Sequence, residues 1–489
     1  MYNKKISDFI RTFVSEIQNS NAGIFAGAGL SQPAGYVDWR ELLRDIADEL
    51  GLDVDKEDDL IAVAQYHVNE HGGRGRLNQV LIENFTKDAQ STRNHEILSQ
   101  LPIDTYWTTN YDHLIEDSLK AKNKIVDVKM TPQNLAITRP ADAIVYKMHG
   151  DVQLSDQAVL TKDDYEEYEV KRSLYSQTLR GELISKTFLF IGFSFDDPNL
   201  SYILSRIRIL LGQDARLHYC FMRKIDREKY SSETEFAYDQ VKQELKIKDL
   251  QRYKIIVLLV DEYDEITEIL ETINYLVKTK NIFISGSAID YGTWGQERAF
   301  KFSTNLSKEI IKKSHNIVSG FGLGIGSCIV SGALEELYDS KAKRVEERLK
   351  ARPFPQATTG RMEISELWTK YRQDMLSNVG IAVFMFGNKK QHDSEKIIDA
   401  NGMIEEFEIS LKNGIVPIPI GATGFTALKL WERVMSDYDK IIGIKSLKPY
   451  FEQLGDTKKS DEELLSLTTS LINEIIKAKI SEGVGVHGS

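Results

Sequence analysis

The segment 22–43, AGIFAGAGLSQPAGYVDWRELL, constrains the possible folds of this chain more than any other stretch. Residues 24–26 form an apolar run that predicts a short buried strand, which Gly27-Ala28-Gly29 interrupts. Glycine adopts positive φ angles and lets a phosphate approach the backbone closely. Asp38 and Glu41 have the spacing of a capping box, and apolar residues at helical spacing follow them. A strand, a glycine turn and a helix in this order are typical of the start of a nucleotide-binding α/β domain.

The glycine turn by itself permits two interpretations. Gln32 occupies the position where the dinucleotide-binding fingerprint G-x-G-x-x-G has its third glycine. The turn is therefore either a nucleotide-binding loop or an ordinary tight turn, and residues further along the chain have to distinguish the two.

Length and charge limit the class of protein. The 489 residues are enough for two or three domains, and 42% apolar and 28% charged residues are typical of a globular protein. A net charge of −11 argues against non-specific nucleic-acid binding. The basic run 341–352 is interpreted as a solvated helix or loop, or as an anion-binding rim. We find no signal peptide and no apolar run of membrane-spanning length, so we expect a cytoplasmic protein that binds neither membrane nor nucleic acid.

Cys220 and Cys328 are the only two cysteines of the sequence. They are too few for a disulfide framework or for a four-cysteine zinc site. Their apolar or small neighbours predict that both are buried core thiols. We therefore expect no bound metal.

In the first half of the chain, polar residues repeatedly follow predicted strands. Thr109, Asn110 and Asp112 end the β-rich run 103–112. Because ligands bind at the carboxyl ends of the strands in an open parallel sheet, we expect these side chains at a ligand site. The alternative is a capped helix start, with Asn110 or Asp112 as the N-cap of a helix over 113–119.

His149 and Gly150 follow another predicted strand, over 143–148. A single histidine in this position is either a base or a hydrogen-bonded structural residue. Its place at the same predicted sheet edge as Asn110 and the glycine turn favours the first interpretation.

The apolar run 187–192 predicts a strand covered on both faces. Ser194 follows it and is expected to contact a ribose or a phosphate. Asp196 or Asp197 is then expected to cap a helix over 200–211.

The second half repeats the alternation of strands and glycine turns. Residues 282–287 are interpreted as a strand followed by a glycine turn at Ser285-Gly286-Ser287. The loop 320–327 has glycine at every second position, so its bare N–H groups before a helix over 328–338 are suited to phosphate binding. A tight turn against another backbone is the alternative. Further buried strands are predicted over 379–386 and 414–420.

Both halves are therefore predicted to be three-layer, Rossmann-like α/β domains with mostly parallel sheets. We expect the first domain over 1–278 and the second over 281–480. The remaining tail covers 481–489, and its last residues, 483–489, are expected to be disordered.

Four motifs of the first half together resemble the catalytic signature of the sirtuins, or SIR2-like proteins. They are 27–31 (GAGLS), 108–112 (TTNYD), 149–150 (HG) and 192–194 (GFS). This resemblance covers residues 1–278 and implies an NAD site. The segment 35–39 reads GYVDW where deacylating sirtuins carry Gly-Ile-Pro-Asp-Phe-Arg, and the zinc-binding cysteines of those enzymes are missing. These departures argue against deacylation and leave the NAD site itself intact.

The second half resembles the SLOG domains, which sense nucleotide-type ligands, through 285–287 (SGS), 320–327 (GFGLGIGS) and 402–407 (GMIEEF). A SIR2-like domain followed by a SLOG-like domain is similar to the effectors of the Thoeris bacterial anti-phage systems. That resemblance implies hydrolysis of NAD, which depletes the cellular pool. It also implies activation by a cyclic ADP-ribose isomer that a TIR-domain partner protein makes, and a homotetramer or a higher assembly.

The resemblances imply three groups of site residues. The catalytic residues are Asn110, His149 and Asp112. The residues that bind NAD are Ala26, Gly27, Ala28, Gly29, Ser31, Thr109, Gly192 and Ser194. The residues that bind the signal ligand are Ser285, Gly286, Ser287, Gly322, Gly324, Arg372, Lys389 and Glu406, with Glu405 as the alternative to Glu406 on a ribose hydroxyl. Ordinary surface charge is the alternative for Arg372 and Lys389.

The expected reaction breaks the bond between nicotinamide and ribose through an oxocarbenium-like centre, as in glycoside cleavage. Nicotinamide leaves as a neutral molecule, so no general acid is needed. His149 is the candidate base or ribose-hydroxyl partner, because imidazole exchanges protons near neutral pH. Asn110 would position the ribose or the water, and Asp112 would support that arrangement. The rival functions are an NAD-dependent protein deacylase and a non-catalytic nucleotide sensor that acts by assembly.

Overall fold

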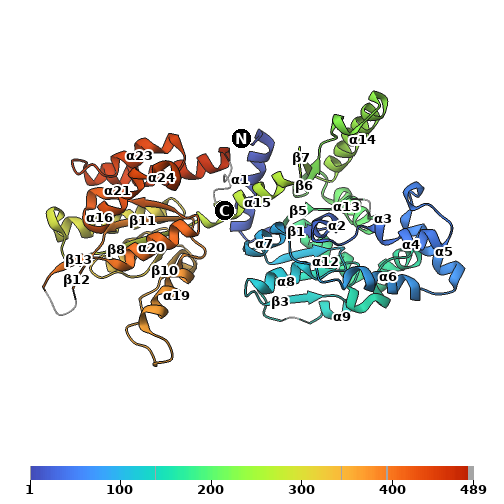
Figure 1. Cartoon of the computed structure of the whole chain (residues 1–489), viewed down its shortest axis with the longest axis horizontal. Helices are drawn as coiled ribbons and strands as arrows, with labels where there is room; N and C mark the ends of the chain where they lie inside the picture. The colour runs from blue at the N-terminus through green and yellow to red at the C-terminus, as the bar shows by residue number, and fades with distance from the viewer. Residues whose placement is uncertain (1, 138, 196, 343, 392–394, 483–489) are drawn as a thin grey trace. The chain divides into compact units, whose positions relative to one another are not determined.

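The computed structural model describes residues 2–482 except 138, 196, 343 and 392–394 (Figure 1). Two compact units make up this part of the chain, one over Tyr2–Asn274 and one from Tyr275 onwards. The division lies inside the helix α15 (Asp264–Lys278), a few residues before the boundary expected from the sequence. The tail over 483–489, expected to be disordered, lies outside the described residues.

The first unit is built on a seven-stranded sheet in the order β3-β4-β2-β1-β5-β6-β7. All its neighbouring strands pair in parallel, and helices cover both faces (Figure 1). Every residue of β1, β2 and β5 is buried, as expected for strands covered on both sides. The strands are β1 (Ala22–Ala26), β2 (Thr105–Thr108), β3 (Val126–Lys129), β4 (Ala143–Lys147), β5 (Thr187–Ile191), β6 (His218–Arg223) and β7 (Ile255–Val260).

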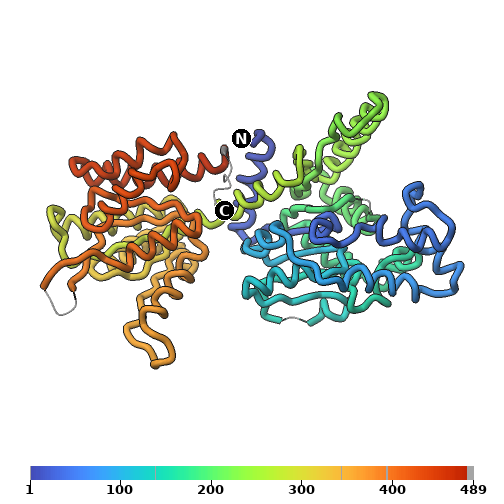
Figure 2. The backbone as a smooth tube through the Cα atoms, viewed as in Figure 1, coloured from blue at the N-terminus to red at the C-terminus, as the bar shows by residue number. Residues whose placement is uncertain are grey.

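Helices precede and connect the strands of the first unit, and those at Leu114–Ala121 and Pro198–Leu211 lie close to the helices predicted over 113–119 and 200–211. The first, α1 (Lys4–Gln18), buries Ile6, Phe9, Ile10, Phe13 and Ile17, which recur at helical spacing. The others are α2 (Ala28–Ser31), α3 (Trp39–Leu42), α4 (Arg44–Glu49), α5 (Leu60–His71), α6 (Gly75–Phe85), α7 (Arg93–Gln100), α8 (Leu114–Ala121), α9 (Pro132–Leu135), α10 (Lys162–Glu166), α11 (Tyr168–Lys171), α12 (Ser173–Ser185), α13 (Pro198–Leu211) and α14 (Glu233–Arg252). Figure 2 shows α14 projecting away from the sheet.

The capping box expected before α3 is half formed. Asp38 Oδ1 accepts a hydrogen bond from the N–H of Glu41 at 2.9 Å, as predicted. The Glu41 carboxylate pairs with Arg44 instead of returning to the cap. The helix expected to continue from here is interrupted at Leu43, which separates α3 from α4.

The second unit has a five-stranded sheet in the order β10-β9-β8-β11-β14, again with parallel pairs throughout. A separate two-stranded antiparallel sheet, β12-β13, lies between β11 and β14 in the sequence. The strands are β8 (Asn281–Ser287), β9 (Asn316–Ser319), β10 (Leu349–Ala351), β11 (Ile381–Phe386), β12 (Asn388–Lys390), β13 (Ile397–Asp399) and β14 (Val416–Pro419). The helices are α16 (Gln296–Lys312), α17 (Gly326–Asp339), α18 (Val345–Arg348), α19 (Ile364–Leu376), α20 (Asn401–Lys412), α21 (Phe425–Ser436), α22 (Tyr438–Ile441), α23 (Lys448–Gln453) and α24 (Asp461–Glu482).

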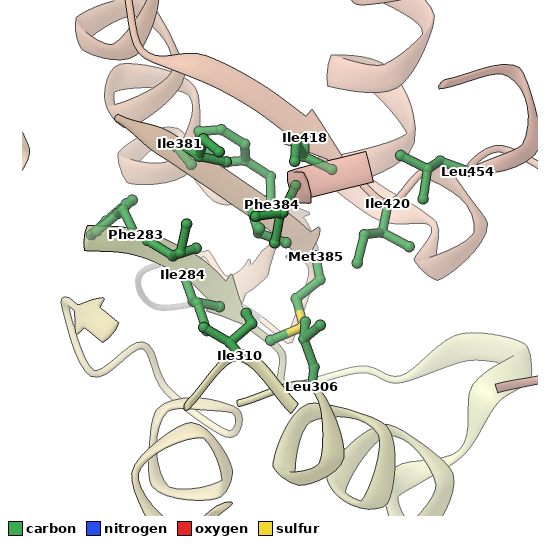
Figure 3. Close-up of a cluster of buried hydrophobic side chains, with 14 of the residues drawn as sticks. Phe283, Ile284, Leu306, Ile310, Ile381, Phe384, Met385, Ile418, Ile420 and Leu454 are labelled. Carbon is green, nitrogen blue, oxygen red and sulfur yellow. The ribbon is translucent and has the colours of Figure 1, made fainter. Parts of the chain in front are cut away.

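Apolar side chains from the central strands and from α16 form the core of the second unit. Figure 3 shows Phe283 and Ile284 of β8, Phe384 of β11, and Leu306 and Ile310 of α16 meeting there. The same core takes in residues after β14 and from near the end of α23, namely Ile420 and Leu454. Two mostly parallel α/β units in succession confirm the predicted fold class.

Three further expectations concern the course of the chain. The glycine turn predicted at Ser285-Gly286-Ser287 is wrong, because these residues pair with β11 inside the sheet as the last part of β8. Cys220 and Cys328 are free, buried thiols as predicted. None of the helices in the described residues is both long enough and apolar enough to span a bilayer.

Candidate functional site

Four strand ends of the first unit form one row across the sheet. Ala26 of β1 is in register with Thr108 of β2 and with Ile191 of β5, and Thr108 is in register with Lys147 of β4. The residues that follow these positions therefore gather at one edge of the sheet. The chain order reverses between β1 and β5, and ligands bind at such switch points of parallel sheets. The structure thus brings together the glycine turn, Thr109, Asn110, His149 and the turn after β5.

The glycine turn packs directly against the backbone after β5. A Cβ atom on Gly27 would lie 2.4 Å from the carbonyl oxygen of Gly192, and one on Gly29 would lie 3.0 Å from the Gly192 Cα. Gly192 itself has φ +63°, and a Cβ there would lie 2.2 Å from the Leu30 nitrogen. The N–H of Gly27 donates to Ile191 and that of Gly29 to Gly192, both at 2.9 Å. These glycines are therefore required by packing, and the two N–H groups are not free to bind a phosphate.

Asn110 is held rigidly by the same turn. Its side-chain amide nitrogen donates to the Gly27 carbonyl at 3.1 Å and to Ser31 Oγ at 3.0 Å, while its backbone N–H donates to Thr108 Oγ1 at 2.9 Å. Both amide hydrogens are used within the protein, which leaves the amide oxygen to accept a hydrogen bond from a ligand or water. Asn110 and Ser31 are both buried.

His149 forms a buried pair with Asp197. His149 Nε2 lies 2.9 Å from Asp197 Oδ2, and both side chains are less than a tenth exposed. The Tyr165 ring meets the imidazole edge to face with centroids 5.6 Å apart, and its hydroxyl donates to Asp197 at 3.4 Å. Among the described residues, His149 Nδ1 is buried without a hydrogen-bond partner, so it is available to a ligand.

Asp197 is also the N-cap of α13, as one of the two predicted alternatives requires. Its Oδ1 accepts the N–H of Leu200 at 2.7 Å. Burial alone would raise the pKa of Asp197, but the charge and contact of His149 together with the Leu200 N–H bring it below the ordinary value. A permanently charged carboxylate stabilises a protonated imidazole beside it. Asp196, the other predicted cap, lies outside the described residues.

The N-cap of α8 is His113, and not Asp112 or Asn110 as the alternative interpretation expected, but Asp112 still makes a structural contact there. Its Oδ1 accepts the N–H of Leu114 at 2.9 Å, at the start of α8. Its other carboxylate oxygen is buried with no hydrogen-bond partner among the described residues. Its backbone carbonyl accepts from the ammonium group of Lys147. These contacts of Asp112 with Leu114 and Lys147 hold the segment that carries Asn110 in place.

Lys147 belongs to a buried charge cluster that was not predicted from the sequence. Its ammonium group lies 3.1 Å from Glu116 and 3.1 Å from Asp151, and His113 Nε2 contacts Asp151 at 2.9 Å. Burial alone would lower the pKa of Lys147, but the two carboxylates outweigh burial and raise it. Lys147 lies inside β4, and nothing in the local sequence indicates that it has two carboxylate partners.

The remaining predicted NAD residues differ in exposure. Ala26 is buried at the end of β1, and Ala28 opens the short helix α2. Thr109 is half buried, and its N–H donates to the Ala26 carbonyl at 3.3 Å. Ser194 is exposed.

The second unit has a buried polar cluster at the corresponding edge of its sheet. Ser285 Oγ donates to Glu406 at 2.5 Å, and Arg372 lies 2.8 Å from Glu405 and 3.5 Å from Glu406. The Arg372 guanidinium also stacks over the Phe354 ring at 4.7 Å. Arg372 is a buried member of this cluster, so the surface-charge alternative does not apply to it.

Glu406 is distinguished from Glu405 by its burial. Burial raises the pKa of Glu406 to about 7, although Ser285 and Arg372 both act to lower it. Glu405 is about a third exposed and accepts from Thr369 Oγ1 at 2.5 Å. Near neutral pH, the Glu406 carboxyl therefore exists in both its neutral and its charged form.

The glycine loop of the second unit packs against β8 and the turn after it. A Cβ on Gly322 would lie 2.0 Å from the Gly286 carbonyl oxygen, and one on Gly324, with φ +77°, 2.0 Å from that of Ala288. The tight-turn alternative therefore explains these two glycines without a ligand. Ser287 Oγ donates to the Asn388 carbonyl at 3.3 Å.

Lys389 and Asn388 adjoin each other but differ in environment. Lys389 is exposed on β12 and lies apart from the buried cluster. Asn388 is buried, and its amide bonds the backbone of residues 289–290 at 2.7–3.0 Å. This asparagine was not predicted, because asparagine is common in loops and its position carries no motif.

Comparison with known proteins gives one match for each unit and several over nearly the whole chain. The family described as "SIR2-like domain" matches residues 104–244, and the "Sir2- and TIR-associating SLOG family" matches residues 265–475. A protein of Cytobacillus dafuensis named "NAD(+) hydrolase ThsA" is 48% identical over 476 residues, which cover 95% of this chain and 96% of the relative. A protein with the same name from Bacillus cereus (strain MSX-D12) is 48% identical over 94% of this chain and 96% of its own length. The "Defense-associated sirtuin 2" of Bacillus subtilis is 26% identical over 56% of this chain and 29% of the relative.

Proposed function

Because this chain belongs to the ThsA family of NAD(+) hydrolases, we propose that its first unit hydrolyses NAD to nicotinamide and ADP-ribose. We propose further that a cyclic ADP-ribose isomer bound to the second unit switches this activity on. The observation that carries the proposal is that Asn110 and the buried His149–Asp197 pair follow strand ends at the same edge of a parallel sheet that has a switch point there. An enzyme that depletes NAD in this way serves as an anti-phage effector.

The chemistry requires a water molecule to attack the ribose carbon as the nicotinamide bond breaks. The bonding electrons go to the pyridinium nitrogen, so nicotinamide leaves neutral and the ribose carbon becomes oxocarbenium-like. The attacking water loses a proton to His149, and the positive charge then resides on imidazolium beside the Asp197 carboxylate. This pairing resembles the way a buried carboxylate holds a catalytic histidine in other hydrolases.

Asn110 and Asp197 have different roles in the proposed mechanism. Asn110 would accept a hydrogen bond from the water or a ribose hydroxyl through its amide oxygen, because its nitrogen is occupied. Asp197 acts on His149 and not on the substrate, so it is a positioning residue. Asp112 and Lys147 would keep the Asn110 segment in place.

The signal ligand is proposed to bind at the buried cluster of the second unit. Arg372 would bind a phosphate and Glu406 a ribose hydroxyl, and the exposed Lys389 would approach a second phosphate. The ligand would activate the first unit only if it binds the active state more tightly than the inactive one. The description of the matched SLOG family as TIR-associating supports a TIR-domain protein as the source of the ligand.

Assembly of several copies, as a homotetramer or larger, is part of the same proposal. Tyr238, Val241 and Leu245 lie on α14 at spacings of three and four residues and are each more than half exposed. An apolar stripe of this kind supports contact with a second copy. Leu245→Glu should lower the mass seen by light scattering, and the neighbouring Lys242→Glu should not.

The cytoplasmic location stays a prediction.

The test is NAD loss by the full chain, with and without a panel of cyclic ADP-ribose isomers and with no acyl peptide. Consumption that rises with one isomer supports the gated hydrolase and identifies the signal. Release of nicotinamide only with an acyl-lysine peptide would indicate a deacylase instead. Binding of NAD without any consumption would indicate a non-catalytic sensor.

A further inference from the structure

Two histidines four residues apart lie on one face of α5, away from the residues of the proposed reaction. They are His67 and His71, near the C-terminal end of the helix. Their rings are stacked, with centroids 4.1 Å apart and planes inclined by 19°. Histidines at this spacing are the standard way for one helix to offer two ligands to a single metal ion.

A carboxylate from the preceding helix completes the group. Glu49 is the last residue of α4, and its Oε2 lies 2.8 Å from His67 Nε2. One candidate ligand atom from each of the three residues lies within 4.8 Å of the other two. Ligand atoms around a tetrahedral zinc ion are about 3.3 Å apart, given zinc–nitrogen bonds of about 2.0–2.1 Å. Small rotations of exposed side chains are enough to reach that geometry.

The neighbours of these residues orient them as ligands. His71 Nδ1 lies 3.1 Å from the His67 carbonyl oxygen, a contact that makes Nδ1 the donor and leaves Nε2 with a free electron pair. Arg76 Nε donates to Glu49 Oε1 at 2.8 Å and leaves Oε2 for another partner.

From this geometry we propose that Glu49, His67 and His71 bind one divalent ion of the zinc class. Two imidazoles and one carboxylate suit zinc, whereas magnesium and calcium prefer oxygen ligands alone. Glu49 and His71 are exposed, so water completes the tetrahedral set. The expectation of no metal considered cysteine ligands only and did not consider this cluster.

The ion would tie α4 to α5 within the helical part of the first unit. The apolar core of these helices, which contains Ile46 and Val63, also contains Tyr111, the residue after Asn110. The ion would thus stiffen the layer that packs behind the proposed NAD site. It would not take part in the reaction, because its ligands include none of the proposed catalytic residues.

The experiment uses the full chain after removal of metals with a chelator. Zinc chloride is titrated by calorimetry, and cobalt(II) by its visible absorption, which is intense only in a tetrahedral site. The test variant is His71→Ala, because it removes an exposed ligand and leaves the His67–Glu49 contact in place. The control is Glu83→Gln, an exposed carboxylate 3.8 Å from Arg76 that is outside the cluster.

We expect one zinc ion per chain in the wild type and in Glu83→Gln, and binding at least tenfold weaker in His71→Ala. Zinc should raise the melting temperature of the wild type and leave that of His71→Ala unchanged. Glu49→Gln gives a second test if His71→Ala is unstable, because glutamine keeps the hydrogen bond but is a poor ligand. Equal affinity in wild type and His71→Ala, or no saturable binding by the wild type, would overturn the proposal and leave a hydrogen-bond network.

Discussion

The two units place a buried carboxylate beside a basic side chain at the same edge of similar sheets, yet the two carboxylates behave in opposite ways. Asp197 has a lowered pKa because His149 and the first turn of α13 favour its charged form. Glu406 has a pKa raised to about 7 because burial outweighs Ser285 and the more distant Arg372. A fixed negative charge is suited to stabilising a cation that forms during a reaction. A carboxyl that changes state near neutrality is suited to reversible binding.

The largest expected effect is on the reaction itself. Asn110→Ala and His149→Ala should each lower NAD hydrolysis by about 10²–10⁴-fold, because each removes a group that acts on the water or ribose. Asn84→Ala, on α6, is the control and should retain the native rate. The rate of NAD loss at saturating signal ligand measures this effect. Hydrolysis at the native rate in either variant would show that the substituted residue is not catalytic, and the contrast between the two units would lose its functional basis.

The second prediction compares the buried cations of the two units. Lys147→Met removes the ammonium group beside Glu116 and Asp151, leaves Glu116 without its cation, and should cost about 3–5 kcal/mol of folding stability. Arg372→Met should cost less than half as much, because Glu406 takes up a proton near neutral pH and Glu405 is partly solvated. Thermal or urea unfolding at pH 7 measures both. Equal losses would show that the two clusters are more alike than their burial indicates.

The third prediction uses the sign of the pH dependence. Between pH 4.5 and 7, Glu406 keeps a proton in the folded chain that the unfolded chain has lost, so stability falls as pH rises. Glu406→Gln has no group that titrates at this position. Its stability relative to the wild type should therefore rise from pH 4.5 to pH 7 and stay constant above pH 7. Asp197→Asn should show the opposite trend: its stability relative to the wild type should fall as the pH rises from the acid range. Melting temperatures between pH 4.5 and 7 test Glu406→Gln, and melting temperatures below about pH 4, the ordinary pKa of aspartate, test Asp197→Asn. Trends of the same sign would refute the contrast.

The smallest expected effect separates the two roles of Asp197, which caps α13 and stabilises the imidazolium form of His149. Asp197→Asn should lower kcat about tenfold with little change in KM, because asparagine still caps α13 but no longer stabilises imidazolium. Asp197→Ala should also destabilise the protein, since it loses the cap. A rise in KM with unchanged kcat would instead place Asp197 against the substrate.

Local patterns in the sequence predicted most of the fold. The helices expected over 113–119 and 200–211 and the strand expected from the apolar run 187–192 were predicted correctly, because each depends on neighbouring residues. The turn at Ser285-Gly286-Ser287 was wrong because pairing with β11 overrides the preference of glycine for turns.

The candidate site was predicted only in part, and the missing residues share a physical reason. The strand-end rule found Asn110 and His149, because it depends on topology alone. It did not find the pairing of Asp197 with His149, since the two are brought together by the fold and Asp197 already had a sufficient role as a helix cap. Lys147 was missed because a lysine inside a strand gives no sign of two carboxylate partners.

The packing of Gly27 and Gly29 against Gly192 has a consequence for how such proteins are recognised in genomes. These glycines hold two backbones together whether or not the molecule retains any activity. A lineage that lost its chemistry would therefore still be selected to keep them, and would still score as an enzyme in motif searches. Surveys that separate working hydrolases from inactive descendants should therefore weigh His149 above these glycines, since Asn110 and Asp197 also make structural hydrogen bonds.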